Sequence, residues 1–126
     1  MAMDLAPGLR LLLLAGTLAL LPLGWVWLRQ PRADAGTRPA ALATRALFLT
    51  FDLTGFGAFT RLSDSGLGCP DWPGCYGHAS PIGANQHIQA AQTALPTGPV
   101  TFSKAWIEMI HRYLAMTVGA LILVLA

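Results

Sequence analysis

The sequence predicts an all-α integral membrane protein built as a bundle of transmembrane helices, and two observations lead to this fold class. Apolar residues make up 54% of the 126 residues and charged residues only 11%, whereas soluble domains carry about 25% charge. The apolar residues also lie in long uncharged runs, of which the first, at residues 11–28, has a length that suits a spanning helix. Membrane lipid is therefore expected to cover the surface that polar side chains cannot. The net charge of +2 gives no indication of a nucleic-acid partner.

The first expected element is a transmembrane helix within residues 1–28. Residues 11–28 form a run of 18 residues without a charge, bounded by Arg10 and Arg29. Trp25 and Trp27 near one end suit the membrane interface. The alternative is a signal peptide cleaved at residues 33–35, but this run exceeds the roughly 7–15 residues of a signal core.

Residues 29–45 are expected to form a short cytoplasmic loop. Basic side chains outnumber acidic ones in it, with Arg29, Arg32, Arg38 and Arg45 against Asp34. Short loops rich in arginine stay on the cytoplasmic side of a membrane. The N-terminus is then periplasmic, and the next helix runs outward.

That next transmembrane helix is expected at residues 46–60. Its 15 residues are fewer than the roughly 20 that span a bilayer, so it is extended back to Leu42 with Arg45 reaching toward the headgroups. Asp52 lies near its middle. An ionisable residue there is either a functional group that faces the bundle interior or a structural partner for a polar group on another helix. The glycine-bearing run at residues 55–58 indicates close packing against a neighbour.

Residues 61–103 are expected to form a periplasmic loop, because they are rich in Gly, Pro, Ser and Asp and carry no positive excess. Residues 104–126 are the start of a third transmembrane helix. From Tyr113 onward there are 14 uncharged residues, fewer than the roughly 20 that a spanning helix needs. We therefore expect the sequence to be a piece of a longer protein.

Both cysteines, Cys69 and Cys75, lie in the periplasmic loop, separated by five residues that include two prolines and a glycine. In an oxidising compartment they are expected to form a disulfide. Three interpretations remain open at this point. The pair is a structural staple, a redox-active pair that exchanges with a partner thiol, or half of a zinc site completed by His78 and His87.

The third helix carries a carboxylate and an imidazole on one face. Glu108 and His111 are three residues apart, and Ala115, Gly119 and Ile122 continue the same face. A neutral imidazole is a good axial ligand for heme iron, and a flat macrocycle needs small side chains beside its ligand. The alternative is a small-x-x-x-small packing motif with an interfacial histidine.

Arg112 has two candidate partners. It meets either a heme propionate or Glu108, four residues earlier on the same helix face. Desolvation of charged groups at the membrane boundary is costly unless they are paired. His78 and His87 lie in loop sequence and are expected to be solvated.

Two stretches, residues 57–77 with the cysteine pair and residues 104–112 with a Glu-x-x-His-Arg helix start, closely resemble proteobacterial heme A synthases. The resemblance covers roughly residues 48–126. It implies an eight-helix core of two similar four-helix halves, each able to hold a heme between two histidines. It also implies a multi-pass protein of the bacterial inner membrane.

The resemblance assigns roles to the residues that match. His111 corresponds to the first heme ligand, an axial ligand to the iron, Glu108 to a carboxylate that takes part in catalysis, and Cys69 and Cys75 to a disulfide. The implied reaction is oxidation of a methyl group of heme O to a formyl group for cytochrome c oxidase biogenesis, with water as the oxygen source. The implied cofactors are heme b and the substrate heme O. The implied partners are heme O synthase, an electron acceptor and a second copy of the chain.

Two departures accompany the resemblance. Residues 1–28 form a helix additional to the family core, and the three remaining histidines of the family lie beyond Ala126. The sequence as it stands is therefore expected to be inactive by itself. Two other functions remain as alternatives: a membrane thiol–disulfide exchange protein that uses Cys69 and Cys75, and a non-enzymatic assembly subunit of an oxidase.

Overall fold

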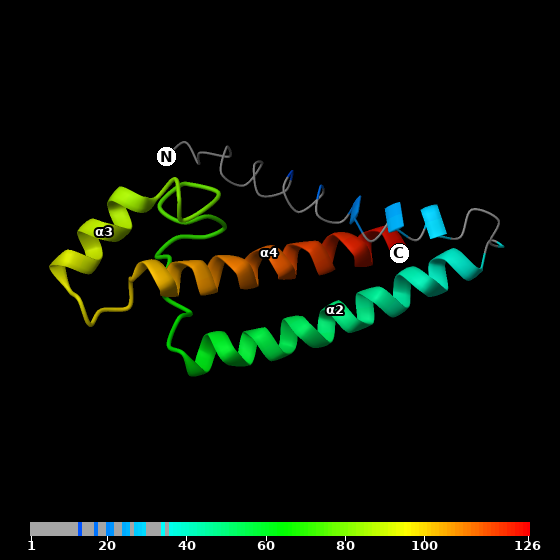
Figure 1. Ribbon diagram of the computed structural model, residues 1–126, viewed down its shortest axis with the longest axis horizontal. Helices are drawn as coiled ribbons and strands as arrows, with labels where there is room; N and C mark the ends of the chain where they lie inside the picture. The colour runs from blue at the N-terminus through cyan, green and yellow to red at the C-terminus, as the bar shows by residue number, and fades with distance from the viewer. Residues whose placement is uncertain are drawn as a thin grey trace.

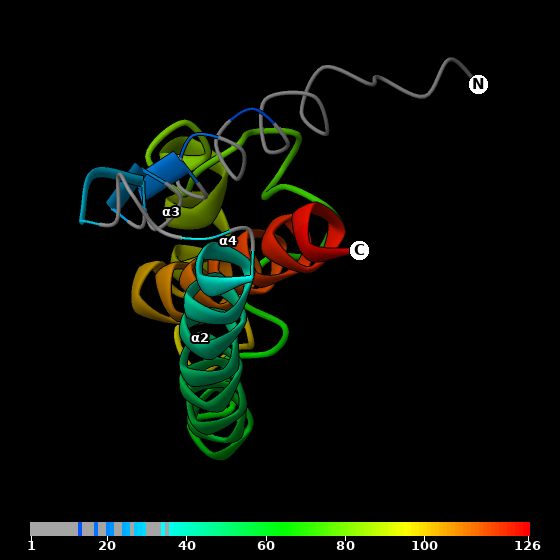
Figure 2. The same ribbon diagram turned by 90° about the vertical axis from the view of Figure 1, so that its right-hand side faces the viewer.

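The computed structural model describes residues 13, 17, 20–21, 24–25, 27–29, 34 and 36–126. The helix expected within residues 1–28 lies largely outside the described residues. The described part contains the helices α2 (Thr37–Leu62), α3 (Asn85–Ala94) and α4 (Phe102–Leu125), and no strand. Helices α2 and α4 run antiparallel and side by side with a tilt between them, and α3 lies at the end where α4 begins (Figures 1 and 2).

Helix α2 begins inside the segment that we expected to be a loop. It starts at Thr37, whereas residues 29–45 were expected to connect two helices. Pro39 is in its first turn, where the missing amide hydrogen is no loss. Ala40 and Ala41 follow and have high helix propensity. The arginines at positions 38 and 45 therefore lie on the helix itself.

The end of α2 turns the chain toward α4. Asp64 has a φ of 53°, the left-handed conformation that commonly ends a helix. Its amide donates to the carbonyl of Arg61 at 3.2 Å, and the amide of Ser65 donates to the carbonyl of Thr60 at 2.9 Å. These two bonds form a Schellman motif, which supplies hydrogen-bond donors for the last helical carbonyls. The chain then leaves the axis of α2 and leads into the segment that packs on α4.

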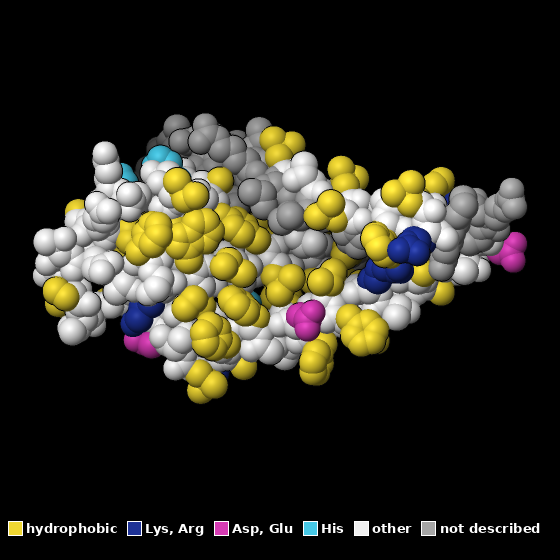
Figure 3. Space-filling view, in the orientation of Figure 1, with side chains coloured by type: hydrophobic (Ala, Val, Ile, Leu, Met, Phe, Trp, Pro, Cys, Tyr) yellow, Lys and Arg dark blue, Asp and Glu magenta, His cyan; other side chains and the backbone are white. Residues whose placement is uncertain are grey.

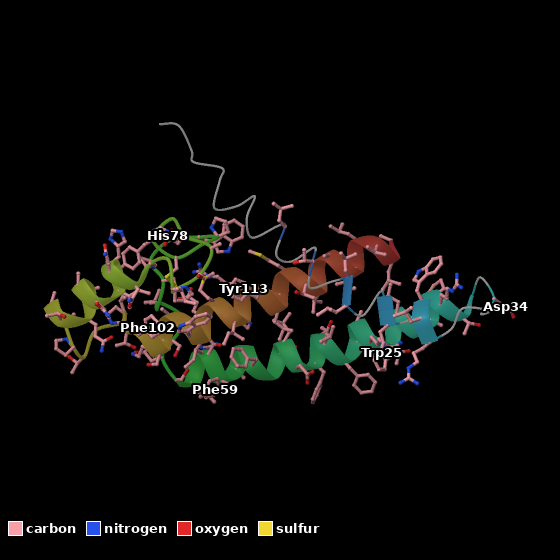
Figure 4. The ribbon with its side chains drawn as sticks, turned by 45° about the horizontal axis from the view of Figure 1, so that its top comes forward. Trp25, Asp34, Phe59, His78, Phe102 and Tyr113 are labelled. Atoms are coloured by element: carbon pink, nitrogen blue, oxygen red, sulfur yellow. A yellow bond between two sulfur atoms is a disulfide. The ribbon has the colours of Figure 1, made fainter. Side chains whose placement is uncertain are left out.

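The segment expected as a periplasmic loop is a packed cap that contains α3. Ile88 of α3 is fully buried in a core whose other buried members are Cys69, Cys75, Ala84, Ala105 and Met109. The phenol of Tyr113 on α4 donates to the carbonyl of Ala79 in the cap, and Figure 4 shows Tyr113 on α4 with His78 in the neighbouring loop. Ile88 is the one buried residue of this ten-residue helix, so α3 is attached to the cap mainly through that side chain.

Helix α4 is the most apolar of the helices among the described residues. Thr101 caps its start by accepting a hydrogen bond from the amide of Lys104 at 3.3 Å. Its 24 residues extend about 36 Å, more than the roughly 30 Å of membrane hydrocarbon. Within the described part of the chain, α4 alone has both the length and the hydropathy of a membrane-spanning helix.

The helical fold agrees with the predicted fold class, and the number of helices in the complete bundle stays a prediction. Away from the cap, α2 and α4 share a small core of Leu42, Ala46 and Leu121. Apolar side chains also cover much of the molecular surface seen in Figure 3. Phe51 and Leu123 are 77% and 79% exposed, which is unusual for a surface that faces water.

Candidate functional site

The cysteine loop is closed by a disulfide. Cys69 and Cys75 are bonded, with their Cα atoms 4.9 Å apart, and both residues are buried. The expected disulfide is therefore present. Sulfur atoms bonded to each other cannot act as thiolate ligands, so the disulfide is incompatible with a zinc site that uses Cys69 and Cys75.

Hydrogen bonds hold the loop in one conformation. The carboxylate of Asp71 accepts from the amides of Tyr76, at 2.5 Å, and Gly77, at 2.7 Å. The backbones of Cys75 and His78 exchange two hydrogen bonds of 2.8 and 2.9 Å. The loop is thus rigid on both sides of its second cysteine.

Two charged side chains of α4 attach this loop to the helix. The amide of Cys69 donates to Oε2 of Glu108 at 2.7 Å. Nη1 of Arg112 donates to the carbonyls of Asp71, at 2.7 Å, and Gly74, at 2.5 Å. Nη2 of Arg112 pairs with Oε1 of Glu108. Of the two partners considered for Arg112, the structure therefore contains the carboxylate on its own helix.

The pair of Glu108 and Arg112 is buried, with 8% and 13% of the two side chains exposed. Such a pair persists only when its remaining donors and acceptors are satisfied. The loop backbone supplies these partners, and Gly68 permits the close approach. A Cβ at Gly68 would lie 2.5 Å from the carbonyl oxygen of Lys104. The cysteine loop and the charged start of α4 are consequently one structural unit.

His111 lies between the two long helices. Its ring stacks on Phe56 of α2, with centroids 6.4 Å apart and an interplanar angle of 16°. A Cβ at Gly57 would lie only 2.9 Å from Nε2 of His111, whereas nothing lies within 4 Å of a Cβ at Gly55. The close packing predicted for residues 55–58 therefore occurs at Gly57, and its neighbour is the candidate ligand.

A single cavity brings the candidate residues together. It has a volume of about 380 Å³ and is lined by Glu108, His111 and Arg112 of α4. The opposite wall comes from the end of α2 and the turn after it: Gly57, Thr60, Arg61, Asp64, Gly66 and Leu67. Binding sites for small molecules have volumes of about 300–1,000 Å³. The site therefore lies where the C-terminal end of α2 and the N-terminal end of α4 meet, next to the cysteine loop.

Sequence reasoning missed the α2 side of this cavity. Asp64 lies in the turn after the helix. Thr60 and Arg61 follow Gly57 by three and four residues. That spacing places the three residues on one face of α2, and it was the available signal. Which side chains they face depends on how α2 packs on α4, and spacing does not show this.

Other candidate residues lie away from the cavity. His87 is exposed, as expected, and stacks on Tyr76 with centroids 5.3 Å apart. His78 is half-buried, so it is only partly exposed to solvent, and its backbone is held by hydrogen bonds to Cys75. Asp52 is exposed on α2, so its expected interior position is not seen among the described residues.

The fold and the site define a class of protein: a helical protein with a helix long and apolar enough to span a membrane, in which a disulfide-closed loop lies beside a cavity bearing a carboxylate and an imidazole. The chain belongs to the family of cytochrome oxidase assembly proteins, whose family model matches residues 40–126. The heme A synthase of Shewanella oneidensis is 54% identical over 67 residues, which cover 53% of this chain and 20% of that protein. These matches confirm the resemblance to heme A synthases.

The chain thus spans about a fifth of the length of the curated relative that it matches. No solved structure matches it.

Proposed function

We propose that this chain is part of a heme A synthase, a membrane oxidoreductase that converts a ring methyl group of heme O to a formyl group. One observation carries the proposal. The carboxylate of Glu108 and the imidazole of His111 line the same cavity, in a chain 54% identical over 67 residues to a protein with this name. The oxidation takes oxygen from water and passes electrons to an external acceptor.

The residue types around His111 suit a tetrapyrrole. The imidazole is half-buried and stacks on an aromatic ring, and Nε2 packs against Gly57 of the opposing helix, so binding of iron at Nε2 would require the imidazole to turn or α2 and α4 to separate there. Ala115 and Gly119 continue the face of His111 deeper along α4 with small side chains. We propose that His111 holds the iron as an axial ligand, a role that suits neutral imidazole. The bound heme supplies the redox chemistry of its iron.

Glu108 is proposed to handle protons during the oxidation, because removing hydrogen from a methyl group releases protons as well as electrons. A carboxylate within a cavity is a suitable acceptor. Its two oxygens are held by the amide of Cys69 and by Arg112, so its position is set before any substrate binds. Arg112 is better placed as the group that positions Glu108 and the loop than as a ligand of the substrate.

We propose that α2 and α4 both cross the bacterial inner membrane, with the cysteine loop on the periplasmic side. The 26 residues of α2 extend about 39 Å, enough for the roughly 30 Å of hydrocarbon. Basic residues outnumber acidic ones in residues 29–45 but not in residues 61–103. This difference supports the proposed orientation, because short loops rich in arginine stay on the cytoplasmic side.

The burial of Cys69 and Cys75 supports the structural staple over thiol exchange, because exchange requires that a partner thiolate reach a sulfur atom.

The test is His111→Ala in the full-length protein, produced in a host that lacks its own heme A synthase. Heme extracted from the membranes is separated and heme A is quantified. We expect His111→Ala to abolish heme A formation. The control is His87→Ala, which removes an exposed histidine outside the cavity and is expected to retain it. Unchanged heme A in the His111→Ala strain would refute the ligand assignment.

A further inference from the structure

The charges that line the cavity do not all have partners. The carboxylate of Asp64 pairs with Nζ of Lys104 at 3.2 Å, and Glu108 pairs with Arg112. Arg61 lines the same cavity, and among residues 36–126 its guanidinium forms no ion pair. The cavity wall therefore carries one positive charge that is not neutralised by the described residues around it.

Arg61 is also suitably placed relative to the proposed iron ligand. It follows Gly57 by four residues, which places both on one face of α2 with a separation of about 6 Å along the helix axis. Gly57 is the residue against which Nε2 of His111 packs. Because α2 ends at Leu62, Arg61 lies on the outer side of His111, where a cation is tolerated at a membrane boundary.

Arg112 is already engaged by the protein. Its Nη1 donates to the loop carbonyls of Asp71, Pro73 and Gly74, and its Nη2 to Glu108, so its guanidinium is held against the cysteine loop and its charge is paired. No hydrogen bond or ion pair joins the guanidinium of Arg61 to another described residue, so within this part of the chain its N–H donors can bind a carboxylate in a bidentate manner.

We infer that Arg61 binds a propionate carboxylate of the tetrapyrrole and so sets the orientation of the ring in the cavity. This inference rests on the proposed function. A tetrapyrrole with its iron at His111 directs its two acidic substituents toward one edge, and Arg61 provides the unpaired cation on the outer side of the cavity. The competing anion is the phosphate of a lipid headgroup, which a helix-terminal arginine also attracts.

The experiment measures the affinity of the full-length protein in nanodiscs for heme. Binding that persists in the His111→Ala variant is subtracted, so that only binding that depends on His111 is analysed. The two probes are heme b and its dimethyl ester, which lacks both carboxylate charges. The variants are Arg61→Gln and, as the matched control, Arg45→Gln. Arg45 is on the same helix, far from the cavity, and donates to the carbonyl of Ala41. Each measurement is made in zwitterionic and in anionic lipid.

We expect the wild-type protein and Arg45→Gln to prefer heme b over the ester by roughly ten- to hundred-fold, the range for hydrogen bonds to a charged group. Arg61→Gln should bind both probes with about the same weak affinity in both lipids.

An Arg61→Gln protein that keeps the full preference for heme b would overturn the inference and leave the proposed function intact. An effect of Arg61→Gln that appears only in anionic lipid, and equally for both probes, would also overturn it and assign Arg61 to the headgroups. A wild-type protein that binds neither probe would reject the proposed function itself.

Discussion

Replacing Gly57 with alanine tests the placement of His111 most directly. The added Cβ would lie 2.9 Å from Nε2, whereas ordinary van der Waals contact begins at 3.4 Å, so the imidazole must shift by at least about 0.5 Å. A displacement of 1 Å in a reacting group costs about a hundredfold in rate, and half that displacement corresponds to roughly tenfold. We therefore expect Gly57→Ala to lower heme A formation by about that factor.

Gly55→Ala is the matched control. It is the same substitution two residues away on the same helix, and its Cβ would meet nothing within 4 Å. Alanine has a higher helix propensity than glycine by up to about 1 kcal/mol, and this gain is common to both variants. A difference between them therefore measures the displacement of His111 and not a change in the helix.

The assay uses the full-length protein in membranes. Heme A is quantified by extraction, heme content by a reduced-minus-oxidised spectrum, and protein amount by immunoblot. We expect both variants to accumulate normally and only Gly57→Ala to show the roughly tenfold lower heme A. If the two variants yielded equal heme A per protein, His111 would not be confined by α2 as the structure indicates, and the reasoning would fail.

The remaining predictions concern the loop and its attachment to α4. The double variant Cys69→Ser, Cys75→Ser should lose about 2 kcal/mol of stability through the larger freedom of the unfolded chain, seen as a lower thermal midpoint. It should still form heme A at permissive temperature, and loss of heme A at full stability would instead indicate a redox-active pair. Arg112→Lys should remove the fork that holds two loop carbonyls, so the disulfide should react faster with a small phosphine; an unchanged rate would contradict the attachment. Asp64→Asn should change stability by less than about 1 kcal/mol, because 89% of this side chain is exposed, and a larger drop in thermal midpoint would show a stronger role for its pair with Lys104.

Several features of the site could be predicted from short-range pattern alone. The shared face of Glu108 and His111 follows from the helical repeat, and so does the pairing of Glu108 with Arg112. The disulfide between Cys69 and Cys75 follows from two cysteines close together in an oxidising compartment. In each case the residues are separated by six positions or fewer, and the backbone geometry of a few residues brings them together.

Helix bounds were predicted less well. The arginines at positions 38 and 45 indicated a loop, yet α2 begins at Thr37, because charge reports the side of a membrane and not the backbone conformation. The ten-residue helix α3 was missed, because the Gly, Pro and Ser residues around it indicated a loop, whereas its buried residue, Ile88, packs in the core that contains Cys69 and Cys75.

The sequence by itself determined the helical class, the cysteine pair and the carboxylate–imidazole face of α4, all of which depend on composition or on spacing within one turn or loop. Only the tertiary structure decided that His111 packs on Gly57, that Glu108 receives the amide of Cys69, and that Arg61 shares their cavity. These contacts join residues about 40 or more positions apart. They depend on how two helices and a folded loop fill space together, which local periodicity does not encode.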